Sequence, residues 1–240
     1  MRKVAFFDID GTLFRWQLYH ELIFELKNME KFSSDEISQI DRAFLGWQSR
    51  NKPWREYENT IFDIFEKKLT DISLDDIVLA SKKVVERSGH KIHNYTFKLL
   101  KDLQKKDYFI VAISGSGQGI VEAFAKLYDI DKCIGHLYEI IDGKFSGKTK
   151  RYTFNRKAEI VREVVESENL TLKDSIAIGD SYGDIGMLEL VDNPIAFNPS
   201  KELLETAQQN GWKIVIDRKD IAYTLENQNG SIILAKTDEF

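Results

Sequence analysis

Several acidic and hydroxyl side chains stand just after short apolar runs, where buried strands would end, and one lysine stands at the start of a predicted helix. The set comprises Asp8, Asp10, Ser114, Ser116, Lys157, Asp180 and Asp184. Ligands of open parallel sheets bind outside the carboxyl ends of the strands. We therefore expect these side chains to gather around one site at that edge of a sheet.

The residue types in this set favour metal-assisted chemistry on a phosphate. Carboxylates that lie close together raise each other's pKa, so a compensating cation is expected. Hard oxygen ligands favour Mg²⁺, which binds one or two carboxylates and keeps water and substrate phosphate as further ligands. Lys157 adds positive charge, and the Ser114-Gly115-Ser116-Gly117 segment opens a predicted helix whose free N–H groups suit a phosphate oxygen. The sequence thus predicts phosphoryl transfer, with Ser114, Gly115 and Lys157 binding the substrate phosphate.

The elements that position these residues follow from the alternation of strand-like and helical segments. Strand-like runs cover residues 4–8, 109–113, 175–179, 194–197 and 213–216, and helical spacing of apolar residues lies between most of them. Asp142-Gly143 separates two further strand-like runs as a hairpin turn. Short strands separated by helices specify a parallel sheet covered on both faces. The predicted fold class is therefore a doubly wound α/β core.

A helical insertion separates the first strand from the other strands of this sheet. Between Phe14 and Gly89 apolar residues recur three or four apart, as at Leu18, Leu22 and Leu26. Capping-box patterns at Ser33-x-x-Glu36 and Ser73-x-x-Asp76 mark two helix starts. We expect residues 1–13 and 90–240 to form the catalytic core and residues 14–89 to form a helical cap.

Composition excludes some partners. The 240 residues carry 34 Lys and Arg against 39 Asp and Glu, a net charge of −5, so we expect no nucleic-acid partner. No apolar stretch approaches the length of a membrane span, so we expect no membrane partner. The single cysteine, Cys133, fits a reducing, cytoplasmic location. The sequence gives no indication of oligomeric state.

The motifs together resemble a known family. They are Asp8-Ile9-Asp10-Gly11-Thr12, Ser114 in Ile-Ser-Gly-Ser, Lys157, and Gly179-Asp180-Ser181-Tyr182-Gly183-Asp184. In this order they resemble the four motifs of the haloacid dehalogenase (HAD) superfamily, whose core is Rossmann-like. The second acid of the first motif is similar to that of the phosphatase branch. The helical insertion, the Ser-Gly-Ser motif and the Asp-Gly-Lys-Phe-Ser-Gly segment before the lysine resemble the phosphoserine-phosphatase-like subfamily.

The resemblance implies a role for each residue. Asp8 would be the nucleophile that forms an aspartyl-phosphate, and Asp10 the general acid and then the general base. Ser114 and Lys157 would hold the transferring phosphoryl group. The implied Mg²⁺ ligands are Asp8, the backbone carbonyl of Asp10, and Asp180, with Asp184 close enough to fix metal-bound water or the lysine.

The resulting interpretation is a Mg²⁺-dependent phosphomonoesterase acting on a small phosphorylated metabolite. One alternative is a phosphotransferase that passes the phosphoryl group to an alcohol. Another is a phospho-accepting signalling domain, against which Asp10 and the cap both count. A dinucleotide-binding reading of Gly115-x-Gly117-x-Gly119 fails because Ile120 stands where a third glycine is required.

The resemblance also yields an expectation about substrate. Phosphoserine phosphatases hold the substrate ammonium with a glutamate and its carboxylate with a cap arginine. The corresponding positions here fall at Gln17 and Ile61, with Glu21 and Arg55 nearby. A neutral amide and an apolar side chain cannot balance a buried ammonium and carboxylate. We therefore expect phosphoserine to be a poor substrate, and a phosphoester without the zwitterion to be preferred.

Overall fold

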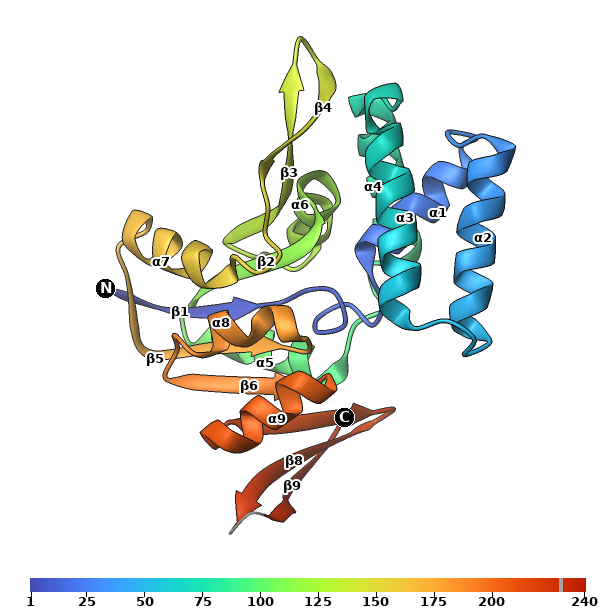
Figure 1. The fold of residues 1–240 in the computed structure, drawn as a ribbon. Coiled ribbons are helices and arrows are strands. Elements are labelled where there is room, and N and C mark those ends of the chain that lie inside the picture. The colour runs from blue at the N-terminus through green and yellow to red at the C-terminus, as the bar shows by residue number, and fades with distance from the viewer. Residues whose placement is uncertain (229–230) are drawn as a thin grey trace.

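The computed structural model describes residues 1–228 and 231–240 (Figure 1). The strands of this part of the chain are β1 (Arg2–Phe7), β2 (Phe109–Gly117), β3 (Lys132–Ile141), β4 (Lys144–Arg151), β5 (Leu170–Gly179), β6 (Asn193–Phe197), β7 (Lys213–Arg218), β8 (Ile221–Gln228) and β9 (Ser231–Glu239). They form one sheet in the order β4-β3-β2-β1-β5-β6-β7-β8-β9. Neighbours from β3 to β7 in that order are parallel, which confirms the predicted α/β fold class.

Both edges of the sheet are antiparallel. At one edge β3 and β4 form the predicted hairpin, whose turn residues Asp142 and Gly143 have φ angles of 50° and 75°. At the other edge β8 and β9 extend the sheet by two antiparallel strands that the sequence analysis does not predict. The predicted parallel sheet is therefore the centre of a mixed sheet, with antiparallel strands at both edges.

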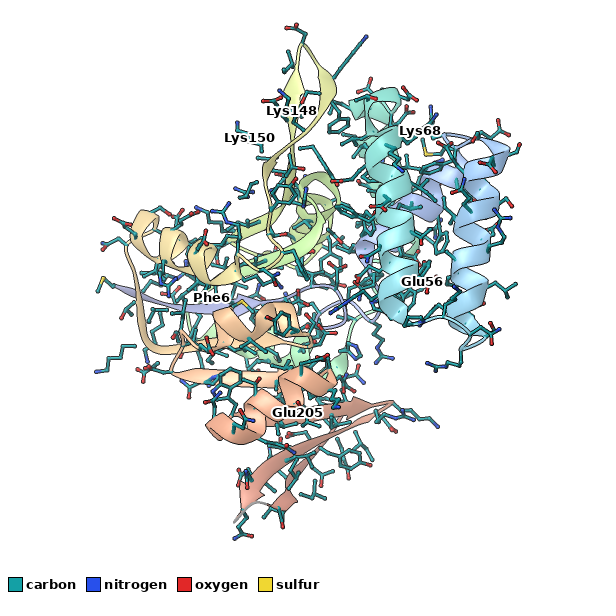
Figure 2. The ribbon with its side chains drawn as sticks, viewed as in Figure 1. Phe6, Glu56, Lys68, Lys148, Lys150 and Glu205 are labelled. Carbon is teal, nitrogen blue, oxygen red and sulfur yellow. The ribbon has the colours of Figure 1, made fainter. Side chains whose placement is uncertain are left out.

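Helices cover both faces of the sheet. The helices of the core are α5 (Asn94–Lys105), α6 (Gln118–Leu127), α7 (Lys157–Ser167), α8 (Ile185–Leu188) and α9 (Lys201–Asn210). Alternate residues of β1 point to opposite faces: Ala5 and Phe7 join the apolar cluster that includes α5 and α6, whereas Val4 and Phe6 join the cluster that includes α7 and α9 (Figure 2). All four side chains are fully buried, so β1 is an inner strand of a sheet that is covered on both faces.

The register of β1 and its neighbours fixes the position of the site. Phe7 pairs with Ala112 of β2 on one side and with Ile178 of β5 on the other. The residues that follow these three positions therefore emerge at the same edge of the sheet. They include Asp8 after β1, Ser114 near the end of β2, and Asp180 directly after β5.

The inserted segment forms four helices beside this edge (Figure 1). They are α1 (Leu18–Asn28), α2 (Ser34–Gln48), α3 (Trp54–Lys68) and α4 (Leu74–Ser88), with a single 3₁₀ turn, η1, at Leu69–Asp71. The predicted capping boxes at Ser33 and Ser73 start α2 and α4. The helices α1 and α4 pack against α6, and their buried residues belong to the same apolar cluster as Ala5 and Phe7. We propose that the cap comprises residues 14–89.

No helix within residues 1–228 and 231–240 is both long enough and apolar enough to cross a membrane.

Candidate active site

A buried lysine lies between two aspartates at the centre of the site. Lys157 is the first residue of α7, and its Nζ donates to Asp8 Oδ1 and to Asp184 Oδ1, both at 2.6 Å. The exposed fractions of Lys157, Asp8 and Asp184 are 6%, 4% and 0%. Burial acts to lower the pKa of Lys157, but attraction by Asp184 and Asp8 outweighs it and raises that pKa. The lysine is therefore a fixed positive charge. Its neighbour Arg156 is exposed and pairs with Glu159 instead.

Asp184 is held rigidly by the turn that follows β5. Its Oδ2 accepts hydrogen bonds from the backbone N–H of Asp180 (3.1 Å), the backbone N–H of Ser181 (2.9 Å) and the Ser181 hydroxyl (3.0 Å). This is a capping box on the 3₁₀ turn η2 (Tyr182–Asp184). A Cβ at Gly179 would lie 2.4 Å from Asp184 Cγ, so only glycine leaves room for this arrangement. Asp184 thus positions Lys157, which it contacts with its other oxygen.

A third acid completes a compact carboxylate cluster. Oxygens of Asp8, Asp180 and Asp184 all lie within 4.8 Å of one another. Gly11 makes room for Asp180: its φ is +88°, and a Cβ there would lie 2.2 Å from Asp180 Oδ2. Asp8, Asp180 and Asp184 are the three carboxylates among the expected metal ligands, and the expected ligand at Asp10 is its backbone carbonyl rather than its side chain.

Burial and mutual repulsion disfavour the charges of this cluster. Burial, opposed in part by Lys157, raises the pKa of Asp8 to about 7. Burial and the neighbouring charges of Asp8 and Asp184 raise the pKa of Asp180 far above its ordinary value. Asp8 Oδ2 is buried and has no hydrogen-bond partner among the described residues. A hard divalent cation would satisfy that oxygen and relieve the repulsion, so the donor set fits Mg²⁺.

The side chain of Asp10 turns toward residues 114–117, the last residues of β2. Its Oδ1 accepts from the Leu18 N–H at 2.5 Å, and its Oδ2 accepts from the hydroxyls of Ser114 and Ser116. Burial nevertheless raises the pKa of Asp10, against the effect of these three donors. The Ser116 hydroxyl also accepts from the Tyr19 N–H at 2.9 Å. Asp10 therefore ties the start of cap helix α1 to the end of β2.

The last residues of β2 include two of the expected phosphate-binding residues, Ser114 and Gly115. Ser114 is fully buried and Gly115 is exposed, and a Cβ at Gly115 would contact nothing within 4 Å. The Ser114 hydroxyl is engaged by Asp10 and by the Ser116 N–H, so it would have to turn to reach a phosphate. The strand β2 leads directly into α6, as the sequence predicts.

The residues considered for substrate recognition lie in different environments. Glu21 accepts from Arg87 at 3.1 Å and from Ser88 at 3.2 Å, so it belongs to an ion-pair network within the cap. Ile61 is 1% exposed and packs in the cap core. Arg55 is exposed, and Gln17 is the N-cap residue of α1 with no side-chain cap bond. Glu21 is thus unavailable to a substrate.

Two residues of the site are missing from the sequence-based set. Ser181 fixes Asp184, and its Ser-x-x-Asp spacing is the same signal that marks the starts of α2 and α4. Glu58 of α3 interacts electrostatically with Asp10. No sequence spacing links Glu58 to Asp10, because their proximity depends on how the cap lies on the core.

Comparison with known proteins agrees with this geometry. The family model described as haloacid dehalogenase-like hydrolase matches residues 5–189. A phosphoserine phosphatase of Methanocaldococcus jannaschii is 24% identical over 94% of this chain and 97% of its own length. A phosphoserine phosphatase of Mycobacterium tuberculosis is 32% identical over 89% of this chain and 70% of its own length. A match to the inhibition of morphological differentiation protein of Streptomyces azureus, 32% identical over 56% of this chain, spans about half (51%) of that relative.

A solved structure shows the same fold. The phosphoserine phosphatase that carries an analogue of the phospho-aspartyl intermediate superposes with a TM-score of 0.62 and 21% identity, over 91% of this chain and 95% of that chain. The chain belongs to the haloacid dehalogenase-like hydrolase family, and within it to the phosphatases that resemble phosphoserine phosphatase.

Proposed function

We propose that this chain is a Mg²⁺-dependent phosphomonoesterase that hydrolyses a small phosphorylated metabolite through an aspartyl-phosphate on Asp8. The observation that supports this most strongly is the pairing of Asp8 with Lys157. One carboxylate oxygen of Asp8 is held by the lysine, and the other is buried without a partner among the described residues. A buried, oriented carboxylate beside a fixed cation suits attack on a phosphate dianion.

The proposed first step forms one bond and breaks another at phosphorus. A carboxylate oxygen of Asp8 bonds to phosphorus as the bond to the leaving alcohol breaks, and Asp10 gives its proton to the alcohol oxygen. Burial raises the pKa of Asp10, and this supports the role because a raised pKa makes the carboxyl a better carrier of a proton than an exposed aspartate. Lys157 and the Ser114 hydroxyl neutralise and orient the transferred group.

The second step reverses the proton transfer. Asp10, now ionised, takes a proton from water, the water oxygen bonds to phosphorus, and the bond to Asp8 breaks, which releases phosphate and restores both residues. Asp8 and Asp180 would hold Mg²⁺ together with the Asp10 carbonyl, and Asp184 would keep Lys157 in place. When bound, Mg²⁺ supplies charge neutralisation of the phosphate and of the acids around it.

Turnover of p-nitrophenyl phosphate in the presence of Mg²⁺ tests this proposal. We expect steady release of phosphate by the wild type, none by Asp8→Asn, and a loss of about 10²- to 10⁴-fold for Asp10→Asn. Asp63→Asn is the matched control, because Asp63 is exposed on α3, and it should behave as wild type. Stoichiometric phosphorylation without turnover would instead favour a signalling domain, and transfer of phosphate to added glycerol would favour a phosphotransferase.

A further inference from the structure

Glu58 lies on the face of α3 that is turned toward the catalytic core. Trp54, one helical turn before it, has its ring centroid 5.6 Å from that of Trp16. Phe62, one turn after it, lies 5.7 Å from Tyr19 and 6.1 Å from His136 of β3. Residues four apart share a helix face. Glu58 is therefore placed between two aromatic side chains that both contact the segment containing Trp16 and Tyr19.

That segment is the one that closes over Asp10. The Leu18 N–H donates to Asp10, the Tyr19 N–H donates to Ser116, and the Trp16 carbonyl accepts from the Gly11 N–H at 3.0 Å. The face of α3 that carries Glu58 therefore lies against the segment that contacts Asp10 and Ser116. The electrostatic interaction between Glu58 and Asp10 agrees with this placement.

The surroundings of Glu58 combine a carboxylate with aromatic faces. Trp54 lies one turn before Glu58 on α3 and Phe62 one turn after it, so aromatic side chains flank the carboxylate on both sides along the helix. Trp16, Trp54 and Phe62 are only partly buried, so part of each side chain remains accessible. A carboxylate among aromatic rings binds ammonium groups, through charge and through cation–π attraction.

The charges near Glu58 argue in the same direction. Burial and the charge of Asp10 raise the pKa of Glu58, and Arg55, an exposed residue of the same helix, acts to lower it. Arg55 also interacts with Glu202 of the core. A leaving alcohol with an anionic group would be repelled by the Glu58 carboxylate, whereas one with a cationic group would be attracted by it.

We propose that Glu58 is a specificity residue that binds an ammonium group on the leaving alcohol, so that the preferred substrates are phosphate esters of amino alcohols without a carboxylate. This inference rests on the proposed phosphatase function. It gives the cap a chemical role in choosing the substrate, in addition to excluding water.

The test compares two substrates of nearly equal shape. Phosphoethanolamine and propyl phosphate differ by an ammonium in place of a terminal methyl group, so the ratio of their kcat/KM values reports recognition of the charge. We expect wild type to favour phosphoethanolamine by about tenfold or more. Glu58→Gln should bring the ratio close to one. Glu56→Gln is the matched control: Glu56 lies on the same helix, is exposed, and pairs with Lys52 at 2.7 Å (Figure 2).

Two further substrates test the recognition of the ammonium group. Phosphoserine adds a carboxylate to phosphoethanolamine and should be hydrolysed less efficiently, whereas phosphocholine should remain a substrate if the aromatic faces contribute. A wild-type ratio at or below one, a ratio unchanged in Glu58→Gln, or phosphoserine above phosphoethanolamine would overturn the inference. The wild-type ratio needs no variant, so the test does not depend on how Glu58→Gln folds. If Asp8-dependent hydrolysis of propyl phosphate persists in that case, the phosphatase proposal stands and only the role of Glu58 is lost.

Discussion

The charge on Asp8 lowers the stability of the fold when no cation is bound, and Asp8→Asn measures this effect. The amide has nearly the same size and shape as the carboxyl but carries no charge. Lys157 keeps its other partner, Asp184, at 2.6 Å in the variant. We therefore expect Asp8→Asn to be more stable than wild type in metal-free buffer at pH 8, although it is inactive.

The expected magnitude follows from the pKa of Asp8. Its value in the folded protein, about 7, lies above the ordinary value of 3.8, because burial disfavours the charge. Asp8 therefore binds more protons in the folded state than in the unfolded state between these two values, and its contribution to wild-type stability rises as the pH falls through 7 toward 4. At pH 8 the ionised group costs the folded state about 4 kcal/mol, and at pH 5 about 2 kcal/mol. These are upper bounds on the gain in Asp8→Asn, since the amide is itself polar and buried.

Urea unfolding in excess EDTA at pH 8 and pH 5 is the measurement. The stability difference between Asp8→Asn and wild type should be positive at pH 8 and should shrink by about half at pH 5. Saturating Mg²⁺ should reduce it too, because the cation offsets the charge of Asp8 in wild type. An Asp8→Asn protein that is less stable than wild type at pH 8 in EDTA would refute this reasoning.

Three further predictions concern the neighbours of Asp8. Asp184→Asn should lower the free energy of unfolding by about 3 kcal/mol, because the amide cannot accept from Lys157 and from three N–H and O–H donors at once. A free energy of unfolding in urea within about 0.5 kcal/mol of the wild-type value would contradict this. Gly11→Ala should raise the Mg²⁺ concentration needed for half-maximal activity by about tenfold or more, since its Cβ would displace Asp180 and its φ of +88° is strained for alanine; an unchanged Mg²⁺ titration would argue against it. Chelation of Mg²⁺ should abolish phosphatase activity and Mg²⁺ should restore it, whereas full activity in excess EDTA, or in Asp180→Ala, would show that the acid cluster is not a metal site.

The sequence predicts the catalytic edge of the sheet better than its margins. Asp8, Ser114 and Asp180 are found together because each follows a short apolar run, and parallel strands bring such ends to one edge. The strands β8 and β9 are missed because burial leaves little pattern there: nearly all of Ser231–Glu239 is exposed, including Leu234 at 57%. The strand β8 pairs with β7, and β9 pairs with β8 only.

The sequence predicts the helices of the cap but not the contacts that the cap makes around the site. Helical spacing and the capping boxes predict its helices, because those signals are local. The placement of Glu58 opposite Asp10, and the capture of Glu21 by Arg87, depend on how helices far apart in the sequence pack together. Local patterns predict which elements form, whereas the choice of substrate depends on contacts between them.

If Asp8 carries the phosphoryl group during turnover, acid quenching will trap the aspartyl-phosphate. The enzyme is mixed with a ³²P-labelled phosphomonoester and Mg²⁺, quenched in acid within the first turnovers, digested and mapped by mass spectrometry. We expect a hydroxylamine-sensitive label on the peptide that contains Asp8, and none in Asp8→Asn. A label on another residue, or undiminished turnover by Asp8→Asn, would contradict it.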